Sequence, residues 1–143
     1  QIDAAMAGKV AQDEAMSQRL AILVSIPGIA EVTALAILVE MPELGALDGK
    51  QAASLAGLAQ VSRQSGKWQG KERIRGGRAL LRRAIYMPAL VAARFNPILK
   101  AKYDQLVLAG KPAKVALTAI MRKLIVLANA LLRDGRTWAK INP

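Results

Sequence analysis

A serine set among cations is the feature of this sequence that could do chemistry. Ser65 lies in Arg63-Gln64-Ser65-Gly66-Lys67, and residues 62–83 hold eight cations and one anion. Such a segment favours a polyanion, above all a nucleic-acid backbone. Close cations could stabilise a serine alkoxide and the charge that builds on a five-coordinate phosphorus. Ser65 is therefore a candidate nucleophile for phosphodiesters, and a structural or phosphate-contacting turn serine stays open as the alternative.

The candidate phosphate-binding residues are the cations near this serine together with one glycine. They are Arg63, Lys67, Arg73, Arg75, Arg78, Arg82, Arg83 and Gly28. Gly28 belongs to Ile26-Pro27-Gly28-Ile29-Ala30, which interrupts two helical patterns in the manner of a helix-hairpin-helix motif. In that motif, backbone N–H groups at the start of the second helix can hold a phosphate. Ala30 stands where the motif normally has glycine, so a plain turn between two helices is an equal alternative.

Composition excludes several other chemistries. The chain of 143 residues has no histidine and no cysteine, which rules out a Ser-His-Asp triad, thiol chemistry, disulfides and zinc sites built from these residues. Its ten acids are scattered, and seven of them precede Ser62. Because a Mg²⁺ site needs converging carboxylates, we expect no metal or other cofactor bound by this chain alone.

The distribution of charge separates two parts of the chain. Residues 1–61 hold three cations and seven anions, whereas residues 62–143 hold eighteen cations and three anions. The net charge of +11 therefore lies in the second part, which predicts that this part faces nucleic acid. A basic surface that serves only to keep the protein hydrated is the alternative.

The elements that must position these residues are helices. Aromatic residues are 3% of a chain that is 53% hydrophobic, so its core is aliphatic and favours helices. Periodicity predicts helices over 3–24, 31–41, 50–58 and 78–94, with a kink at Pro88. Asn96-Pro97 should begin a helix that ends near Ala109, with Gly110 at C′. Pro112 at N1 should begin the last helix, which would end near Arg133.

Four details of this prediction are specific enough to test. The last helix should bury a stripe of Val115, Ala119, Leu124, Leu127 and Leu131. The first should carry a broken stripe of Met6, Val10, Met16, Leu20 and Leu23. Residues 59–77 lack helical periodicity and predict either a basic loop or a small β-hairpin. The prediction is one compact all-α domain with a helix-hairpin-helix-like element and an N-terminal helical extension.

No membrane segment is expected. The best apolar run, residues 116–132, is interrupted by Arg122 and Lys123. The chain begins without methionine inside a helical pattern, which is typical of a fragment of a longer protein, and its start is no signal peptide.

Several motifs together resemble one known family. They are Ile26-Pro27-Gly28-Ile29, Leu55-Ala56-Gly57-Leu58, Arg63-Gln64-Ser65-Gly66-Lys67, Arg73-Ile74-Arg75-Gly76-Gly77, Arg94-Phe95-Asn96-Pro97, Gly110-Lys111-Pro112 and Ala119-Ile120-Met121-Arg122-Lys123-Leu124. In this order, over roughly residues 20–138, the chain resembles the C-terminal domain of the RuvC-like, bridge-RNA-guided serine transposases of bacterial insertion sequences (the "IS one-hundred-ten" type).

The resemblance implies a function. Members of that family carry an N-terminal RuvC-like domain whose acids bind Mg²⁺, then a coiled-coil connector, then the serine-bearing domain. Residues 1–20 would be the end of the connector and residues 21–143 the C-terminal transposase domain. By the match of its Gln-Ser-Gly context, Ser65 would attack DNA and form a phosphoserine link during transposition. The implied partners are DNA, a guide RNA and further copies of the parent protein, in the bacterial cytoplasm at the nucleoid.

Two non-catalytic functions remain alternatives to the transposase interpretation. The RuvC-like domain is absent from this sequence, so the chain alone should not recombine DNA. A non-catalytic, helix-hairpin-helix-like DNA-binding module would use the same cations without needing Ser65. An oligomerisation domain would use the apolar stripes and show no salt-sensitive affinity for DNA.

Overall fold

The protein is built from α-helices packed around one central helix. The computed structural model describes residues 2–57 and 79–138, and the side chains from residue 12 onward within these ranges. The helices are α1 (Ile2–Val24), α2 (Glu31–Glu40), α3 (Gly49–Leu55), α5 (Ala79–Phe95), α6 (Pro97–Leu108) and α7 (Ala113–Asp134). The described ranges contain no β-strand, so the prediction of an all-α fold is confirmed. The basic loop or hairpin expected at 59–77 lies outside them.

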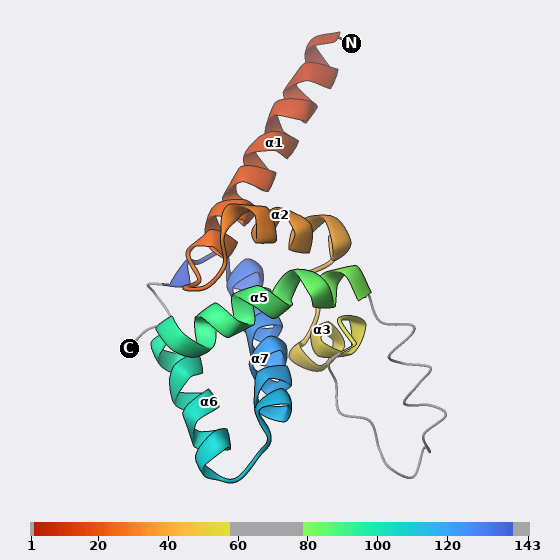
Figure 1. Ribbon diagram of the computed structural model, residues 1–143. Helices are drawn as coiled ribbons and strands as arrows, with labels where there is room; N and C mark the ends of the chain where they lie inside the picture. The colour runs from red at the N-terminus through yellow and green to blue at the C-terminus, as the bar shows by residue number, and fades with distance from the viewer. Residues whose placement is uncertain (1, 58–78, 139–143) are drawn as a thin grey trace, which may run out of the picture.

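Helix α7 lies at the centre of the fold. It contacts α1, α3, α5 and α6, and Figure 1 shows it running behind α5 with α3 and α6 to either side. Helix α3 approaches it closely because its first residue is Gly49, whose missing Cβ would lie 3.4 Å from a methyl group of Val126. The large side chains buried completely around α7 include Leu81 and Ile85 from α5. The aliphatic core that the composition predicts is therefore organised on the last helix.

The buried face of α7 differs in register from the predicted stripe. Leu124 and Leu131 are buried as expected, but Val115 is 50% exposed, and Ala119 and Leu127 are only partly covered. The face that α7 buries consists of Ala116, Leu117, Ile120, Met121, Leu124, Ile125, Ala128, Asn129 and Leu131. Because several helices surround α7, it buries two adjacent rows of side chains, where the single predicted stripe covers one.

The first helix leaves the body of the molecule. The N-terminal half of α1 projects away from the other helices, while its C-terminal end packs beside α2 and α7 (Figure 1). Leu23 is buried and Leu20 is partly buried, whereas Met16 is 46% exposed. Met16 is exposed because no other described helix packs on that part of α1, and Met6 and Val10 of the predicted stripe lie outside the described side chains. The division at residues 20 and 21 stays a prediction.

Helix ends follow the capping signals with one exception. Asn96 caps α6 by accepting hydrogen bonds from the Ile98 and Leu99 N–H groups, at 3.1 and 3.2 Å. Gly110 follows the end of that helix with a positive φ of 91°, as its predicted C′ position requires. Pro112 is the N-cap of α7, one residue before the predicted N1 position. Helix α5 continues through Pro88 as one helix.

A buried asparagine on α7 forms hydrogen bonds with the connection between α2 and α3. Nothing in the sequence indicated this role. Asn129 on α7 is 1% exposed. Its side-chain oxygen accepts a hydrogen bond from the Gly45 N–H, and its amide nitrogen donates one to the Leu47 carbonyl, both at 2.6 Å. These bonds satisfy a buried amide that would otherwise cost free energy, and they hold α3 beside α7.

A second connection joins the end of α1 to the last residue of the described chain. The Ser25 hydroxyl, at the end of α1, accepts a hydrogen bond of 2.9 Å from the backbone N–H of Trp138. The Trp138 side chain is 8% exposed and belongs to the core. Ser25 is therefore held in a structural role.

One helix in the described residues, α7, is long and apolar enough to cross a membrane by length and composition alone. Half of the window that meets this criterion is buried inside the protein, and the central helix of a water-soluble domain meets the same criterion. Arg122 and Lys123 interrupt the apolar sequence near its middle. We assign α7 to the core of the fold.

Candidate nucleic-acid interface

Most of the sequence-predicted site falls within one segment that the structure does not describe. Residues 58–78 contain Arg63, Ser65, Lys67, Arg73, Arg75 and Arg78, and the roles assigned to them stay predictions. The described structure fixes the two ends of this segment. Helix α3 and Gly57 precede it, and α5 follows it from Ala79.

The two remaining predicted cations lie on the first turns of α5. Arg83 is exposed and Arg82 is partly buried. Their helix is anchored by Leu81 and Ile85, which are both fully buried on its apolar face. This anchoring places Arg83 at the surface immediately after the basic segment, so its predicted contact with phosphate is sterically open.

Gly28, the predicted phosphate contact in the hairpin, lies against α5. Its φ is +112°, and a Cβ added to it would come 2.9 Å from the Ala92 Cβ and 3.1 Å from the Pro88 carbonyl oxygen. The neighbouring Pro27 carbonyl accepts a hydrogen bond of 3.2 Å from the Asn96 side chain. Packing on α5 therefore already requires glycine at this position. The phosphate contact stays a prediction, and Glu31 in the first turn of α2 places a negative charge beside it.

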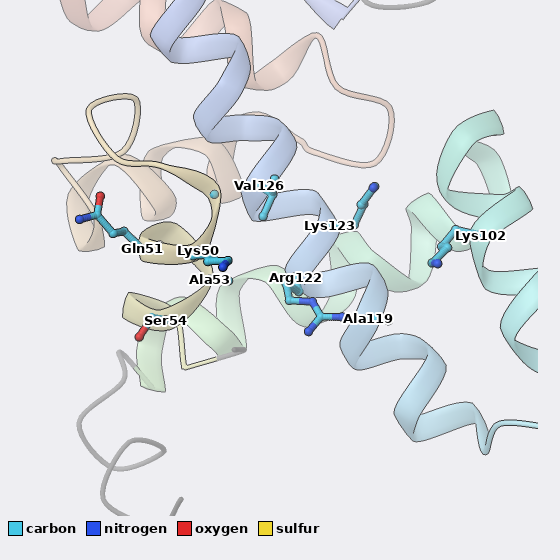
Figure 2. Close-up of a pocket in the computed structure, with 10 residues that line it drawn as sticks. Lys50, Gln51, Ala53, Ser54, Lys102, Ala119, Arg122, Lys123 and Val126 are labelled. Carbon is cyan, nitrogen blue, oxygen red and sulfur yellow. The ribbon is translucent and has the colours of Figure 1, made fainter. Parts of the chain in front are cut away.

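A groove between α3, α6 and α7 brings together four cations that sequence reasoning did not select. It has a volume of about 880 Å³, and Figure 2 shows Lys50 on the α3 side and Lys102 on the α6 side of Arg122 and Lys123, which come from α7. The remaining lining residues are Gly49, Gln51, Ala53, Ser54, Ala119 and Val126, so none of the described residues that line the groove is an acid. We call these four cations and their surroundings the basic groove.

The cations of the basic groove have no charged or hydrogen-bonding side-chain partner among the described residues. Within the described part of the chain, none of the four forms an ion pair or a side-chain hydrogen bond. Lys50, Lys102 and Lys123 are exposed, and Arg122 is partly covered. Their charges are therefore available to an external anion, and the walls of a groove concentrate the potential that they create.

Other cations of the basic half are neutralised within the protein. Lys100 pairs with Asp104 at 2.8 Å on α6. At the end of α7, Arg133 and Arg136 both contact Asp134, at 3.1 and 3.2 Å. The hydrogen bond from Arg133 is the main cause that holds the pKa of Asp134 below its ordinary value. Potential for binding anions is therefore unevenly distributed over the surface.

Only part of the basic groove had a signal in the sequence. Arg122 and Lys123 interrupt the most apolar helix of the chain, and such an interruption marks an exposed face. Lys50 and Lys102 lie 72 and 20 residues before Arg122, and only the packing of α3 and α6 on α7 brings them to the same groove.

The described residues also contain no group of three or more acids able to hold a metal ion.

Comparisons with known proteins identify relatives of this chain. The family described as "Transposase IS116/IS110/IS902 family" matches residues 20–104, more than half of the sequence. The insertion element IS110 uncharacterized 43.6 kDa protein of Streptomyces coelicolor is 33% identical over 124 residues, which are 85% of this chain and 31% of that protein. The pilin gene-inverting proteins of Moraxella bovis and Moraxella lacunata are each 33% identical over 130 residues, 87% of this chain and 40% of theirs. The chain thus spans about a third to two fifths of these relatives.

Proposed function

The chain belongs to the transposase IS116/IS110/IS902 family, and from this premise we propose that it is the serine-bearing C-terminal domain of a longer transposase. The family match carries the proposal, since the relatives include an insertion-element protein and proteins named for inverting a pilin gene. DNA is accordingly the proposed partner, and a guide RNA and further copies of the parent protein complete the proposed assembly. It would act in the bacterial cytoplasm on nucleoid DNA.

In the proposed reaction Ser65 is the nucleophile. Its hydroxyl oxygen attacks a DNA phosphorus and loses its proton, and the phosphodiester bond to the leaving oxygen breaks. The released DNA end takes up a proton as a hydroxyl, and the other end stays linked to Ser65 as a phosphodiester. Strand exchange then reverses the step with a new DNA hydroxyl. The link conserves the energy of the broken bond, so rejoining needs no added cofactor.

The proposed role of the surrounding cations is to hold the phosphate and stabilise charge. Arg63, Lys67, Arg73 and Arg75 would contact the reacting phosphate and its neighbours, and Arg78, Arg82 and Arg83 would bind the flanking backbone. A guanidinium offers several N–H donors in one plane, so the arginines among these residues can each donate more than one hydrogen bond to a phosphate. They leave the transfer of protons to groups outside this chain.

We assign Mg²⁺ to acids of the parent protein's RuvC-like domain. The described residues do not offer the converging carboxylates that would hold the ion here. When bound in the assembly, the ion would supply Lewis-acid activation of the phosphodiester. The 143-residue chain is therefore expected to bind DNA without recombining it.

Covalent capture of DNA by the full-length parent tests this proposal. We would incubate wild type, Ser65→Ala and the matched control Ser62→Ala with labelled donor DNA, guide RNA and Mg²⁺, denature the samples, and resolve them on a gel. A protein–DNA band in wild type and Ser62→Ala that is lost in Ser65→Ala, with DNA affinity retained, supports Ser65 as nucleophile. The same band in Ser65→Ala, or active cleavage without a band in any sample, would sink the assignment.

A non-catalytic DNA-binding module is the second candidate function. The basic groove favours it, because the four cations that line it come from described helices and could bind DNA without any chemistry at Ser65. The two candidates differ in the same experiment. A binding module keeps every activity of the parent protein after Ser65→Ala, whereas the proposed recombinase loses transposition.

A further inference from the structure

We propose that the basic groove between α3, α6 and α7 is a binding site for the DNA sugar–phosphate backbone, built on cations that lie outside the sequence segment carrying Ser65. The choice of DNA over another polyanion depends on the proposed function. The site itself is argued from Lys50, Lys102, Arg122 and Lys123.

The arrangement of charge favours a polyanion. Four cations from three helices line one groove of about 880 Å³, and its lining within residues 2–57 and 79–138 includes no acid. Like charges that converge in this way repel one another, which costs stability unless a ligand offsets the repulsion. A single small anion could reach only some of them, since they lie on both walls and along the floor (Figure 2). A chain of phosphates can contact all of them together.

The lining also admits a backbone at close range. Between the cations the groove is lined by the small residues Gly49, Ala53 and Ala119, which leave room for a backbone to approach. The side chains of Gln51 and Ser54 can hydrogen-bond with phosphate or sugar. Arg122 and Lys123 come from the central helix, whose position is fixed by the core on its other side. The charges at the floor of the groove are therefore held by a rigid element, and those of Lys50 and Lys102 can adjust on either side.

The position of the groove fits a second contact on the same DNA. Its α3 wall ends at Leu55, ten residues before Ser65 in the sequence. DNA held in the groove would therefore leave it close to where the chain enters the proposed catalytic segment. On this basis the groove holds the DNA backbone and carries no sequence information, as expected for contacts to phosphate and sugar.

The test compares two charge-matched double variants of the 143-residue chain. Lys102→Gln/Lys123→Gln removes two cations of the groove. Arg94→Gln/Lys111→Gln removes two exposed cations that do not line it and that form no ion pair with another described residue. Affinity for a labelled DNA duplex is measured by fluorescence anisotropy between ~50 and ~200 mM salt. Circular dichroism confirms that each variant retains its helices.

The groove predicts a specific loss of salt dependence. Each phosphate contact contributes about 0.9 to the slope of log K against log salt, so the groove variant should lose about 2 in slope and on the order of tenfold in affinity near 0.1 M salt. The control variant should keep a slope close to that of wild type. Equal slopes for all three proteins, or equal losses in both variants, would overturn the proposal.

A charge-conserving variant and a chemical footprint keep the test independent of folding. Lys102→Arg/Lys123→Arg should retain the wild-type slope. In the unmodified protein, bound duplex should protect Lys102 and Lys123 from acetylation while Lys111 stays reactive. Absence of this protection at saturating DNA would contradict the proposal even if the glutamine variant misfolds. Protection by single-stranded or duplex RNA without protection by DNA would overturn the choice of DNA.

The outcome is separable from that of the proposed reaction. Ser65→Ala should leave the salt slope of the groove unchanged. If covalent capture fails while the groove variant still loses slope, the groove stands and the nucleophile does not. If capture succeeds and the slope is unaffected by the groove variant, the groove proposal alone is wrong.

Discussion

Replacing Gly28 with alanine should destabilise the protein substantially, because this glycine lies where two constraints coincide. Its φ of +112° is a conformation that L-residues rarely adopt, and holding alanine there costs about 1–3 kcal/mol. The new Cβ would also lie 2.9 Å from the Ala92 Cβ and 3.1 Å from the Pro88 carbonyl oxygen. Relieving such overpacking costs a further ~1–3 kcal/mol. We expect a loss near ~4 kcal/mol in the free energy of unfolding, the middle of the summed range.

Gly110 provides the matched control. Its φ is +91°, yet a Cβ added to it would meet nothing within 4 Å. Gly110→Ala therefore carries the conformational cost without the collision, and the difference between the two variants measures packing against α5. Urea unfolding followed by circular dichroism gives both free energies, and for a domain of this size ~4 kcal/mol corresponds to a fall of roughly 10–15 °C in Tm.

A double-mutant cycle identifies the colliding partner. Ala92→Gly alone should cost about 1 kcal/mol, because it places glycine inside α5. In the Gly28→Ala background the same change removes the closest contact, so the two substitutions should couple favourably by about 1 kcal/mol or more. Equal losses for Gly28→Ala and Gly110→Ala, together with zero coupling, would refute the packing argument. Unchanged stability with a lower salt slope for DNA would instead favour the phosphate contact.

Three further outcomes follow from the hydrogen bonds and charges of the described residues. Asn129→Leu should lower the free energy of unfolding by about 2–4 kcal/mol in urea melts, because two loop groups lose their buried partner; an unchanged midpoint would contradict this. Asn96→Ala should cost about 1–2 kcal/mol as a lost cap, whereas Asn96→Ser retains a capping oxygen without burying a charge and loses the bond to Pro27, so it should cost less. Arg133 holds the pKa of Asp134 in the folded protein below its ordinary value of 3.8. The ionised Asp134 therefore stabilises the fold above pH 3.8, and this stabilisation is lost as the pH falls through the lowered pKa of the folded protein. Asp134→Asn should therefore make Tm less dependent on pH below pH 3.8. The same pH dependence in both proteins would show that this ion pair does not contribute to stability.

The sequence predicted the helices better than the surfaces that they form. Strong local signals, such as Asn96-Pro97 at the start of α6 and Gly110 after its end, placed helix boundaries within a residue or two. The buried face of α7 was harder, because periodicity identifies an apolar stripe but not how many neighbours a helix has. Val115 continues that stripe in the sequence and is exposed in the first turn of α7.

The candidate site was likewise predictable only where its residues are neighbours in the sequence. A run of cations around Ser65 is visible in the sequence because its members are neighbours along the chain. The basic groove was missed because Lys50 and Lys102 reach Arg122 only through the tertiary packing of three helices. Asn129 was missed for a related reason, since nothing local distinguishes an asparagine that holds a distant loop from one that faces water.

The position of α7 at the centre of the fold has a consequence for how the protein is made. Helical proteins usually fold quickly because most of their contacts are local. Here the Gly45 bond to Asn129 spans 84 positions, and the Ser25 bond to Trp138 spans 113. Because a ribosome delivers the N-terminal helices first, their apolar faces lack the central partner until α7 has emerged. We expect a nascent or truncated chain that ends before Ala113 to be held by chaperones or degraded, so that the cell obtains the folded domain only from complete synthesis of its last helix.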